Sequence, residues 1–145
     1  MGLFNRASKG AGKAVSREAF QACIAAGILM AAGDGKIDRE ETDKTINVIG
    51  VNDTFKSFNR AEIQKQAQAY ATLITTDARM GRLKLLKEIE DVAGNVEIGE
   101  QVFITAISVG EASGDGIGSQ EYAVLVKIGE ILGLKPEDYD VKAPT

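Results

Sequence analysis

Two short acidic loops hold the residues of this sequence whose types and spacing best suit chemistry. The first loop carries Asp34, Asp38 and Glu41, and the second, about eighty residues further on, carries Asp115 and Glu121. Carboxylate oxygens are the ligands that calcium and magnesium prefer in proteins. Five carboxylates from two facing loops would repel one another unless a cation lay between them. One interpretation is therefore a divalent cation site, for calcium or magnesium, made of these five side chains.

A second interpretation gives the same carboxylates a structural role. Each loop contains an Asp-Gly pair, which is typical of a tight turn, and acidic side chains at a helix start are favoured by the helix dipole. The first loop matches only the back half of an EF-hand, because the front ligand positions fall on Met30 and Ala32, which have no side-chain oxygen. An EF-hand is therefore excluded, while the cation site and the turn-and-cap interpretation both stay open.

The second loop departs from the first in two ways. When the loops are aligned without a gap, Gly118 occupies the position that corresponds to Asp38. In the same alignment Gly114, rather than Asp115, lies opposite Asp34, and if Asp115 is aligned with Asp34 instead, one residue is missing before Glu121. The carboxylate of Asp115 is therefore expected to point elsewhere.

Composition excludes several functional classes. The 145 residues include no histidine, which removes the commonest general base and a common metal ligand. No nucleophile motif and no phosphate-binding loop occurs in the sequence, so we do not expect an enzyme. The formal net charge of −4 argues against nucleic-acid binding. The single cysteine, Cys23, has apolar neighbours and is expected to be a small core residue in a reducing compartment.

The acidic loops need helices to position them, and apolar residues at helical spacing predict helices on both sides of each loop. Six helices and a final short turn are expected: after Ser16 to Gly33, Asp38 to Ile49, Asn59 to Thr76, Asp77 to Gly94, Ile98 to Ala112, Ser119 to Gly133, and Lys135 to Tyr139. No strand pattern occurs. The sequence therefore predicts a single all-α domain, residues 16–145, with two helix-loop-helix halves joined by a helical middle.

Local signals refine the ends and faces of these helices. Asp38 with Glu41, and Asn59 with Glu62, form capping-box patterns. Gly33 is expected to end the first helix in a left-handed conformation. Five apolar residues of the fourth expected helix are predicted to face inward: Met80, Leu83, Leu86, Ile89 and Val92.

Residues 1–15 differ in composition from the remainder of the chain. They include Arg6, Lys9 and Lys13 and no acidic residue. One interpretation is a flexible basic N-terminal arm, and the other is a weak contact between this arm and an anionic membrane surface. The longest apolar run, from Ala22 to Ala32, is far shorter than the roughly 20 residues that a membrane span requires.

The order of these motifs resembles that of the tellurite resistance protein TerB family. An apolar helix leads into Ala32-Gly33-Asp34-Gly35 and the pair Glu40-Glu41, and a second leads into Ser113-Gly114-Asp115-Gly116 and Glu121. The ending from Ile131 to Tyr139 resembles the closing Leu-Gly-x-x-Pro-Glu pattern of the family. The resemblance covers most of the chain, from about Phe20 to Val141.

The resemblance implies an all-helical domain of about seven helices in two pseudo-symmetric halves. It implies a non-enzymatic role in resistance to tellurite and other stresses, alongside an integral membrane TerC partner and calcium-binding TerD relatives. It also implies a metal site at Asp34 and Glu41 in the first loop and at Asp115 and Glu121 in the second. We therefore expect a cytoplasmic stress-response protein that acts by binding, with peripheral contact at the inner face of the membrane if the arm binds lipid. The alternative is a metal-free helical adaptor.

Overall fold

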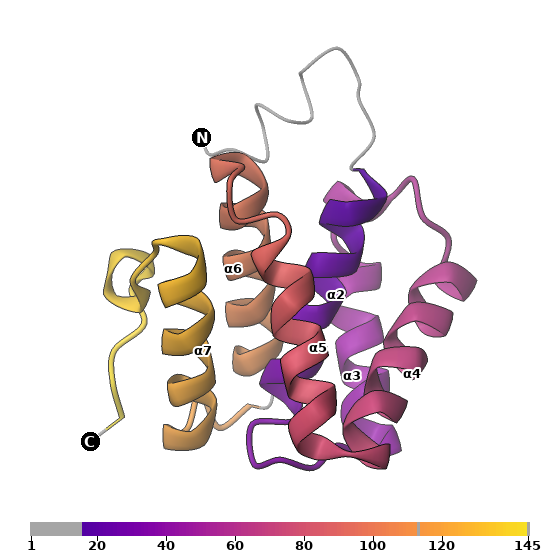
Figure 1. Ribbon diagram of the computed structural model, residues 1–145, viewed down its shortest axis with the longest axis horizontal. Helices are drawn as coiled ribbons and strands as arrows, with labels where there is room; N and C mark the ends of the chain where they lie inside the picture. The colour runs from indigo at the N-terminus through magenta and orange to yellow at the C-terminus, as the bar shows by residue number, and fades with distance from the viewer. Residues whose placement is uncertain (1–15, 113, 145) are drawn as a thin grey trace.

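The computed structural model describes residues 16–112 and 114–144, which form a bundle of helices running alternately up and down (Figure 1). Six α-helices are described: α2 (Arg17–Ala31), α3 (Arg39–Gly50), α4 (Arg60–Thr76), α5 (Ala78–Glu90), α6 (Val96–Glu111) and α7 (Ser119–Leu132). Two short 3-10 helices accompany them: η1 (Asp53–Phe55) and η2 (Pro136–Tyr139). No strand occurs in this part of the chain, and the predicted single all-α domain is confirmed. The predicted arm, residues 1–15, lies outside the described residues and stays a prediction.

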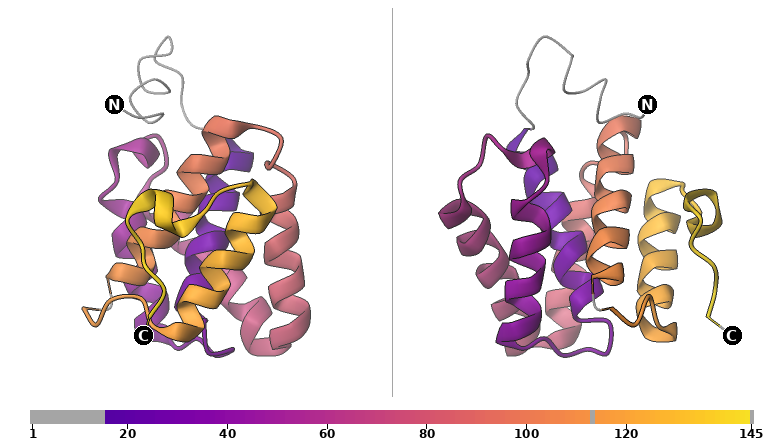
Figure 2. Two further views of the ribbon diagram at one scale, coloured as in Figure 1. Left: turned by 90° about the vertical axis from the view of Figure 1, so that its left-hand side faces the viewer. Right: turned by 180° about the vertical axis from the view of Figure 1, so that it is seen from behind.

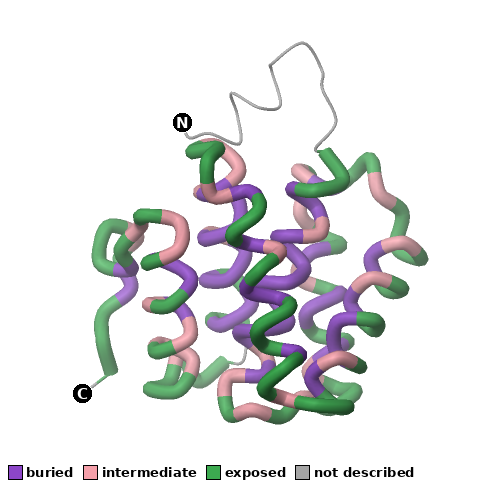
Figure 3. Tube along the Cα trace, in the orientation of Figure 1, coloured by how far each residue is buried: buried purple, intermediate pink, exposed green. Residues whose placement is uncertain are grey.

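Helix α2 lies at the centre of the bundle because it is apolar on nearly all sides. All but four of its 15 residues are buried, and it contacts α3, α4, α5, α6 and α7, most extensively α6 (Figure 3). Gly27 permits the close packing, since a Cβ there would lie 3.0 Å from Thr45 Cγ2 and 3.3 Å from Val109 Cγ2. Among the described helices, none is long and apolar enough to cross a membrane.

The predicted arrangement in two halves is visible in the order and direction of the helices (Figure 2). Helices α2 and α3 form one antiparallel pair and α6 and α7 form the other, while α4 and α5 join them. The two halves meet through α2 and α6. This packing places the loop after α2 and the loop after α6 at the same end of the bundle.

Side-chain caps fix where several helices begin. Asp38 and Glu41 form the predicted capping box of α3, and Asn59 and Glu62 form that of α4. Asp77 caps α5, also as predicted. Each of these side chains satisfies a backbone N–H that the helix itself leaves unpaired. These three helix starts are therefore set by residues within one turn of the helix.

The turns around two helix ends differ from the prediction. The residue with left-handed backbone after α2 is Gly35, at φ 89°, and Gly33 is not among the residues with positive φ. The prediction for Gly33 was therefore wrong, because three residues lie between the end of α2 at Ala31 and the residue with positive φ, Gly35. The N-cap of α7 is Gly118 rather than the predicted Ser119, which is the first residue of that helix.

The buried residues of α5 agree only in part with the prediction. Met80 and Leu83, which were expected to face inward, are 50% and 56% exposed. Where α5 crosses α4, a Cβ on Gly81 would lie 2.6 Å from the carbonyl carbon of Leu73, so the close crossing requires glycine at the contact. Leu86, Ile89 and Val92 are buried as predicted. The crossing adds Gly81 and Leu85 to the side of α5 that faces the core.

Candidate functional site

The two acidic loops meet at one end of the bundle through a glycine. A Cβ on Gly33 would lie 3.1 Å from Glu121 Cγ and 3.4 Å from the Glu121 Cα and backbone nitrogen. The first turn of α7 therefore packs directly against the first loop, and a side chain at Gly33 would push the two loops apart. The expectation that Glu121 lies close to the first loop is confirmed by this contact.

The carboxylates of the first loop are engaged with their own backbone. Asp38 Oδ1 accepts a hydrogen bond from the Glu41 N–H at 2.8 Å, and Glu41 Oε1 accepts one from the Asp38 N–H at 3.0 Å. Asp34 Oδ1 accepts a hydrogen bond from the Lys36 N–H at 3.0 Å, which closes the tight turn. One oxygen of each acidic side chain thus performs the turn or cap role that the sequence also allowed.

The second loop repeats half of this pattern. Glu121 Oε1 accepts a hydrogen bond from the Gly118 N–H at 2.8 Å, as Glu41 does from the residue three positions before it. Gly118 has no side-chain oxygen that could accept a hydrogen bond from the Glu121 N–H, so only one of the two hydrogen bonds of a capping box is present. Asp115 is exposed and lies between Gly114 and Gly116, which have φ values of 86° and 77°. The cap at Gly118 and Glu121 matches the gap-free alignment of the two loops, whereas the positive φ of Gly35 corresponds to that of Gly116 only when Asp115 is aligned with Asp34.

The electrostatics of the first loop centre on Glu41. Burial raises the pKa of this carboxyl, the hydrogen bond from the Asp38 N–H lowers it, and the negative charges of Asp38 and Asp34 raise it further. The net effect is an increase in pKa, so the ionised form of Glu41 is disfavoured by its surroundings. The three acids of this loop therefore do repel one another, as the cation interpretation assumed.

The positively charged side chain of Arg82 lies beside this loop. A Cβ on Gly35 would lie 3.6 Å from Arg82 Nη2, so the guanidinium of α5 stands over the turn. No sequence signal pointed to Arg82, because its approach depends on how α5 packs rather than on local spacing. Among the described residues Arg82 forms no ion pair with the carboxylates of this loop, so its observed contact is with the backbone of the turn.

The five predicted ligands do not form a cation site in this arrangement. Within residues 16–112 and 114–144, no three acidic, cysteine or histidine side chains converge as metal ligands would. No buried side-chain nitrogen or oxygen in the same residues lacks a hydrogen-bond partner that an ion or ligand would have to supply. The residues as placed do not fit a bound calcium or magnesium ion, and the predicted site at Asp34, Asp38, Glu41, Asp115 and Glu121 stays a prediction.

The one thiol of the chain is placed where it cannot react. Cys23 is fully buried in α2, and this burial raises its pKa to about 12, against a smaller lowering by the hydrogen bond with Thr105. The thiolate is the nucleophile and the metal ligand, and almost none of it forms near neutral pH. The structure therefore confirms the predicted core position of Cys23.

Comparison with known proteins gives one match. A family model described as "Tellurite resistance protein TerB" matches residues 20–143, which include all six described α-helices in whole or in part and both acidic loops. Neither the curated proteins nor the solved structures gave a match.

Proposed function

The chain belongs to the tellurite resistance protein TerB family, and from this premise we propose that it contributes to tellurite resistance and stress response as a non-catalytic binding protein. The observation that carries the proposal is the family match over residues 20–143. Its partners are other proteins of the same response: an integral membrane TerC-like protein or TerD-like proteins. It acts in the cytoplasm, at the inner face of the membrane where such a partner lies.

The chemistry of the described residues supports binding rather than turnover. Reduction of tellurite by a thiol of this protein would require that thiol to be accessible, and Cys23 is buried with a raised pKa. The acidic side chains Asp34, Asp38, Glu41 and Glu121 are held in turns and caps. These contacts stabilise the fold, and we infer that the protein binds its partners through other parts of its surface.

A second candidate is binding assisted by a divalent cation, and one observation favours it. The charges of Asp38 and Asp34 raise the pKa of Glu41, so a cation near that carboxylate would relieve repulsion. Each carboxylate also keeps an oxygen beyond the one used in its cap. In this version calcium or magnesium would draw the second loop, with Asp115 and Glu121, toward the first. A titration with these ions separates the two candidates and is described in the Discussion.

Growth on tellurite tests the proposed function directly. A tellurite-sensitive strain that lacks its own TerB-like protein would receive the parent chain, the Cys23→Ala variant or an empty vector. We expect the parent and Cys23→Ala to restore growth equally, because the role requires surfaces and not a thiol. Failure of the parent would contradict the function, and failure of a folded Cys23→Ala variant would contradict the non-catalytic role.

A further inference from the structure

A groove of about 470 Å³ runs between helices α4 and α5 on the outside of the bundle. We call it the α4–α5 groove, and it is lined by Tyr70, Leu73, Leu83, Lys84, Leu85, Lys87, Glu88 and Asp91. The crossing of the two helices at Gly81 and Leu73 lies at one end of the groove. From that crossing α4 and α5 diverge (Figure 1), and the divergence leaves the space between them.

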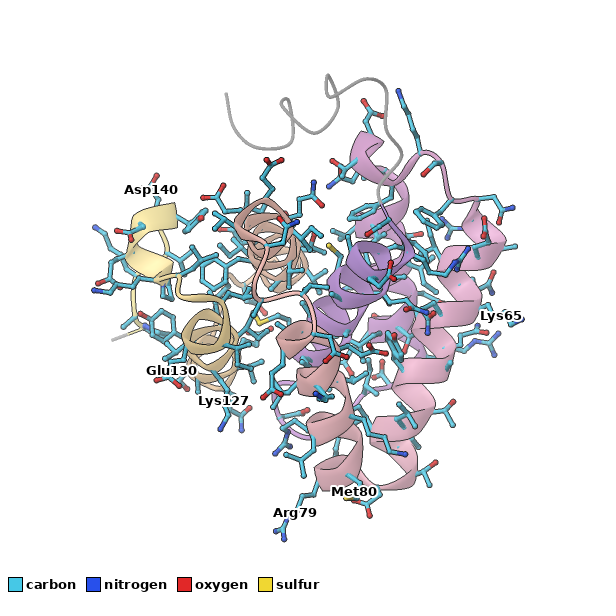
Figure 4. All side chains as sticks on the ribbon, turned by 45° about the horizontal axis from the view of Figure 1, so that its top comes forward. Lys65, Arg79, Met80, Lys127, Glu130 and Asp140 are labelled. Carbon is cyan, nitrogen blue, oxygen red and sulfur yellow. The ribbon has the colours of Figure 1, made fainter. Side chains whose placement is uncertain are left out.

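Apolar side chains are exposed at this groove. The described residues include four large apolar side chains that are strongly exposed: Val51, Met80, Leu83 and Val96. Met80 and Leu83 lie one turn apart on α5, whereas Val51 follows α3 and Val96 begins α6. Figure 4 shows Met80 beside Arg79, both projecting away from the body of the bundle. A local pair of exposed apolar side chains beside a groove is typical of a surface that another molecule covers.

Positive charges gather at the end of the groove where α5 begins, although the groove lining itself holds two cations, Lys84 and Lys87, and two carboxylates, Glu88 and Asp91. The first ten residues of α5 include Arg79, Arg82, Lys84 and Lys87 and no acid, in a chain whose net charge is −4. Lys87 pairs with Asp91 at 3.2 Å. Arg82 faces the first acidic loop, as shown above.

Arg79 and Lys84 are the two basic residues of this group that form no ion pair with another described residue and do not face the first loop. The ion pairs of residues 16–112 and 114–144 are Lys87 with Asp91 and another pair at the start of α2, so neither Arg79 nor Lys84 takes part in one. Glu88, one turn further along α5 than Lys84, accepts a hydrogen bond from the neutral Tyr70 hydroxyl at 3.1 Å. The end of the groove at which α5 begins therefore presents Arg79 and Lys84, neither of them in an ion pair among the described residues, next to the exposed side chains of Met80 and Leu83.

We propose that the α4–α5 groove binds an acidic amphipathic segment of a protein partner. Apolar side chains of that segment cover Leu83 and Met80, and its carboxylates face Lys84 and Arg79. The proposal rests on the function proposed above, because it names the surface through which the protein would meet its partner. Charge complementarity of this kind selects partners and accelerates their encounter.

A protein segment fits these observations better than an anionic membrane. The groove is concave between two helices, which suits side chains that insert into it. Only two large apolar side chains are exposed on α5, which is fewer than the continuous apolar stripe of a helix that lies in a membrane interface.

Fluorescence anisotropy of the full chain with a labelled model peptide tests the proposal. The probe is a helical peptide with a leucine stripe flanked by glutamates, and its control replaces every glutamate by lysine. We expect the acidic peptide to bind the parent, and Leu83→Asp or Lys84→Glu to weaken binding about tenfold or more. The matched controls are Val51→Asp, another exposed apolar residue, and Lys127→Glu, an exposed lysine of α7 (Figure 4), and both should leave the affinity within about twofold.

Several results would overturn the proposal. These are no binding of the acidic peptide by the parent, equal binding of the lysine peptide, or equal losses in Leu83→Asp and Val51→Asp. Backbone amide chemical shifts give a second measurement, since the peptide must move those of Tyr70, Leu73 and Leu83 rather than those of α7. Leu83-dependent binding to anionic phosphatidylglycerol vesicles without peptide binding would assign this face to a membrane, and a dimer lost in Leu83→Asp would assign it to a second copy.

Growth on tellurite separates failure of the groove from failure of the proposed function. If Leu83→Asp restores growth as well as the parent, the α4–α5 groove is not the partner surface, while the family function stands. If the parent itself fails to restore growth, the proposed function fails whatever the peptide does. We expect Leu83→Asp to lose growth and Val51→Asp to retain it.

Discussion

Replacing Gly81 by alanine should stabilise helix α5 taken alone but destabilise its packing against α4. Gly81 lies in the interior of α5, where alanine is favoured over glycine by about 1 kcal/mol. In the bundle, however, the added Cβ would lie 2.6 Å from the carbonyl carbon and oxygen of Leu73 and 2.7 Å from the backbone nitrogen of Ile74. These are backbone atoms, so the clash cannot be relieved by a change of rotamer and α4 must move away from α5.

The net effect follows from the two opposing contributions. Overpacking of a filled interior costs about 1–3 kcal/mol, and a clash with backbone belongs at the upper end of that range. After subtraction of the gain in helix propensity, Gly81→Ala should lower the free energy of unfolding by about 2 kcal/mol. For a domain of this size the melting temperature should fall by roughly 4–8 °C.

Gly99 provides a matched control in another helix. It is also helical and buried, but a Cβ there would meet only the Leu132 side chain, at ordinary contact distances of 3.5 Å to Cδ2 and 4.0 Å to Cβ. Gly99→Ala should therefore be neutral or more stable than the parent by about 0.5–1 kcal/mol. Urea unfolding followed by circular dichroism measures both variants. If Gly81→Ala is as stable as Gly99→Ala, the account of the helix crossing is refuted, and with it the origin of the α4–α5 groove.

Three further predictions concern the first loop and the core. Gly35→Ala should destabilise by about 1 kcal/mol, because φ is 89° there, and a thermal melt equal to that of the parent would contradict this. The pKa of Glu41 is raised in the folded state, so the folded protein binds a proton at this carboxyl more tightly than the unfolded chain does. The contribution of Glu41 to the free energy of unfolding is therefore present at low pH and is lost as pH rises through the folded-state pKa. Glu41→Gln should therefore gain stability relative to the parent near neutral pH, and the difference should shrink as pH falls below the folded pKa; a difference independent of pH would be the contrary result. Cys23, with a pKa of about 12, should resist iodoacetamide in the native protein and react after denaturation, whereas rapid native labelling would show that α2 opens.

Most features set within one helical turn could be predicted from the sequence, although the left-handed residue after α2 and the N-cap of α7 were misplaced, and features set by packing could not. The capping boxes at Asp38 and Asn59 depend on a side chain and an N–H three residues away, so spacing alone identified them. The contact of Gly33 with Glu121 followed in part from the repeat, which brings equivalent loops to one end of the bundle. The outward position of Leu83 depends on where α5 crosses α4, and no pattern within α5 specifies that crossing.

In the candidate site, too, local features could be predicted from the sequence and tertiary contacts could not. The acidic residues and their loops were evident in the sequence, and so was the choice between ligands and caps. Local hydrogen bonds to Asp34, Asp38, Glu41 and Glu121 account for four of the five carboxylates without an ion. The approach of Arg82 to the first loop is a tertiary contact and was missed.

The melting temperature of the full chain with and without millimolar calcium or magnesium, at constant ionic strength, tests the central claim most directly. If the acidic loops are turns and caps and the protein acts through its surfaces, neither ion changes the melting temperature. A bound ion would raise it by mass action. A rise with either ion that disappears in the Asp34→Asn plus Glu41→Gln variant would contradict our account and establish the cation site.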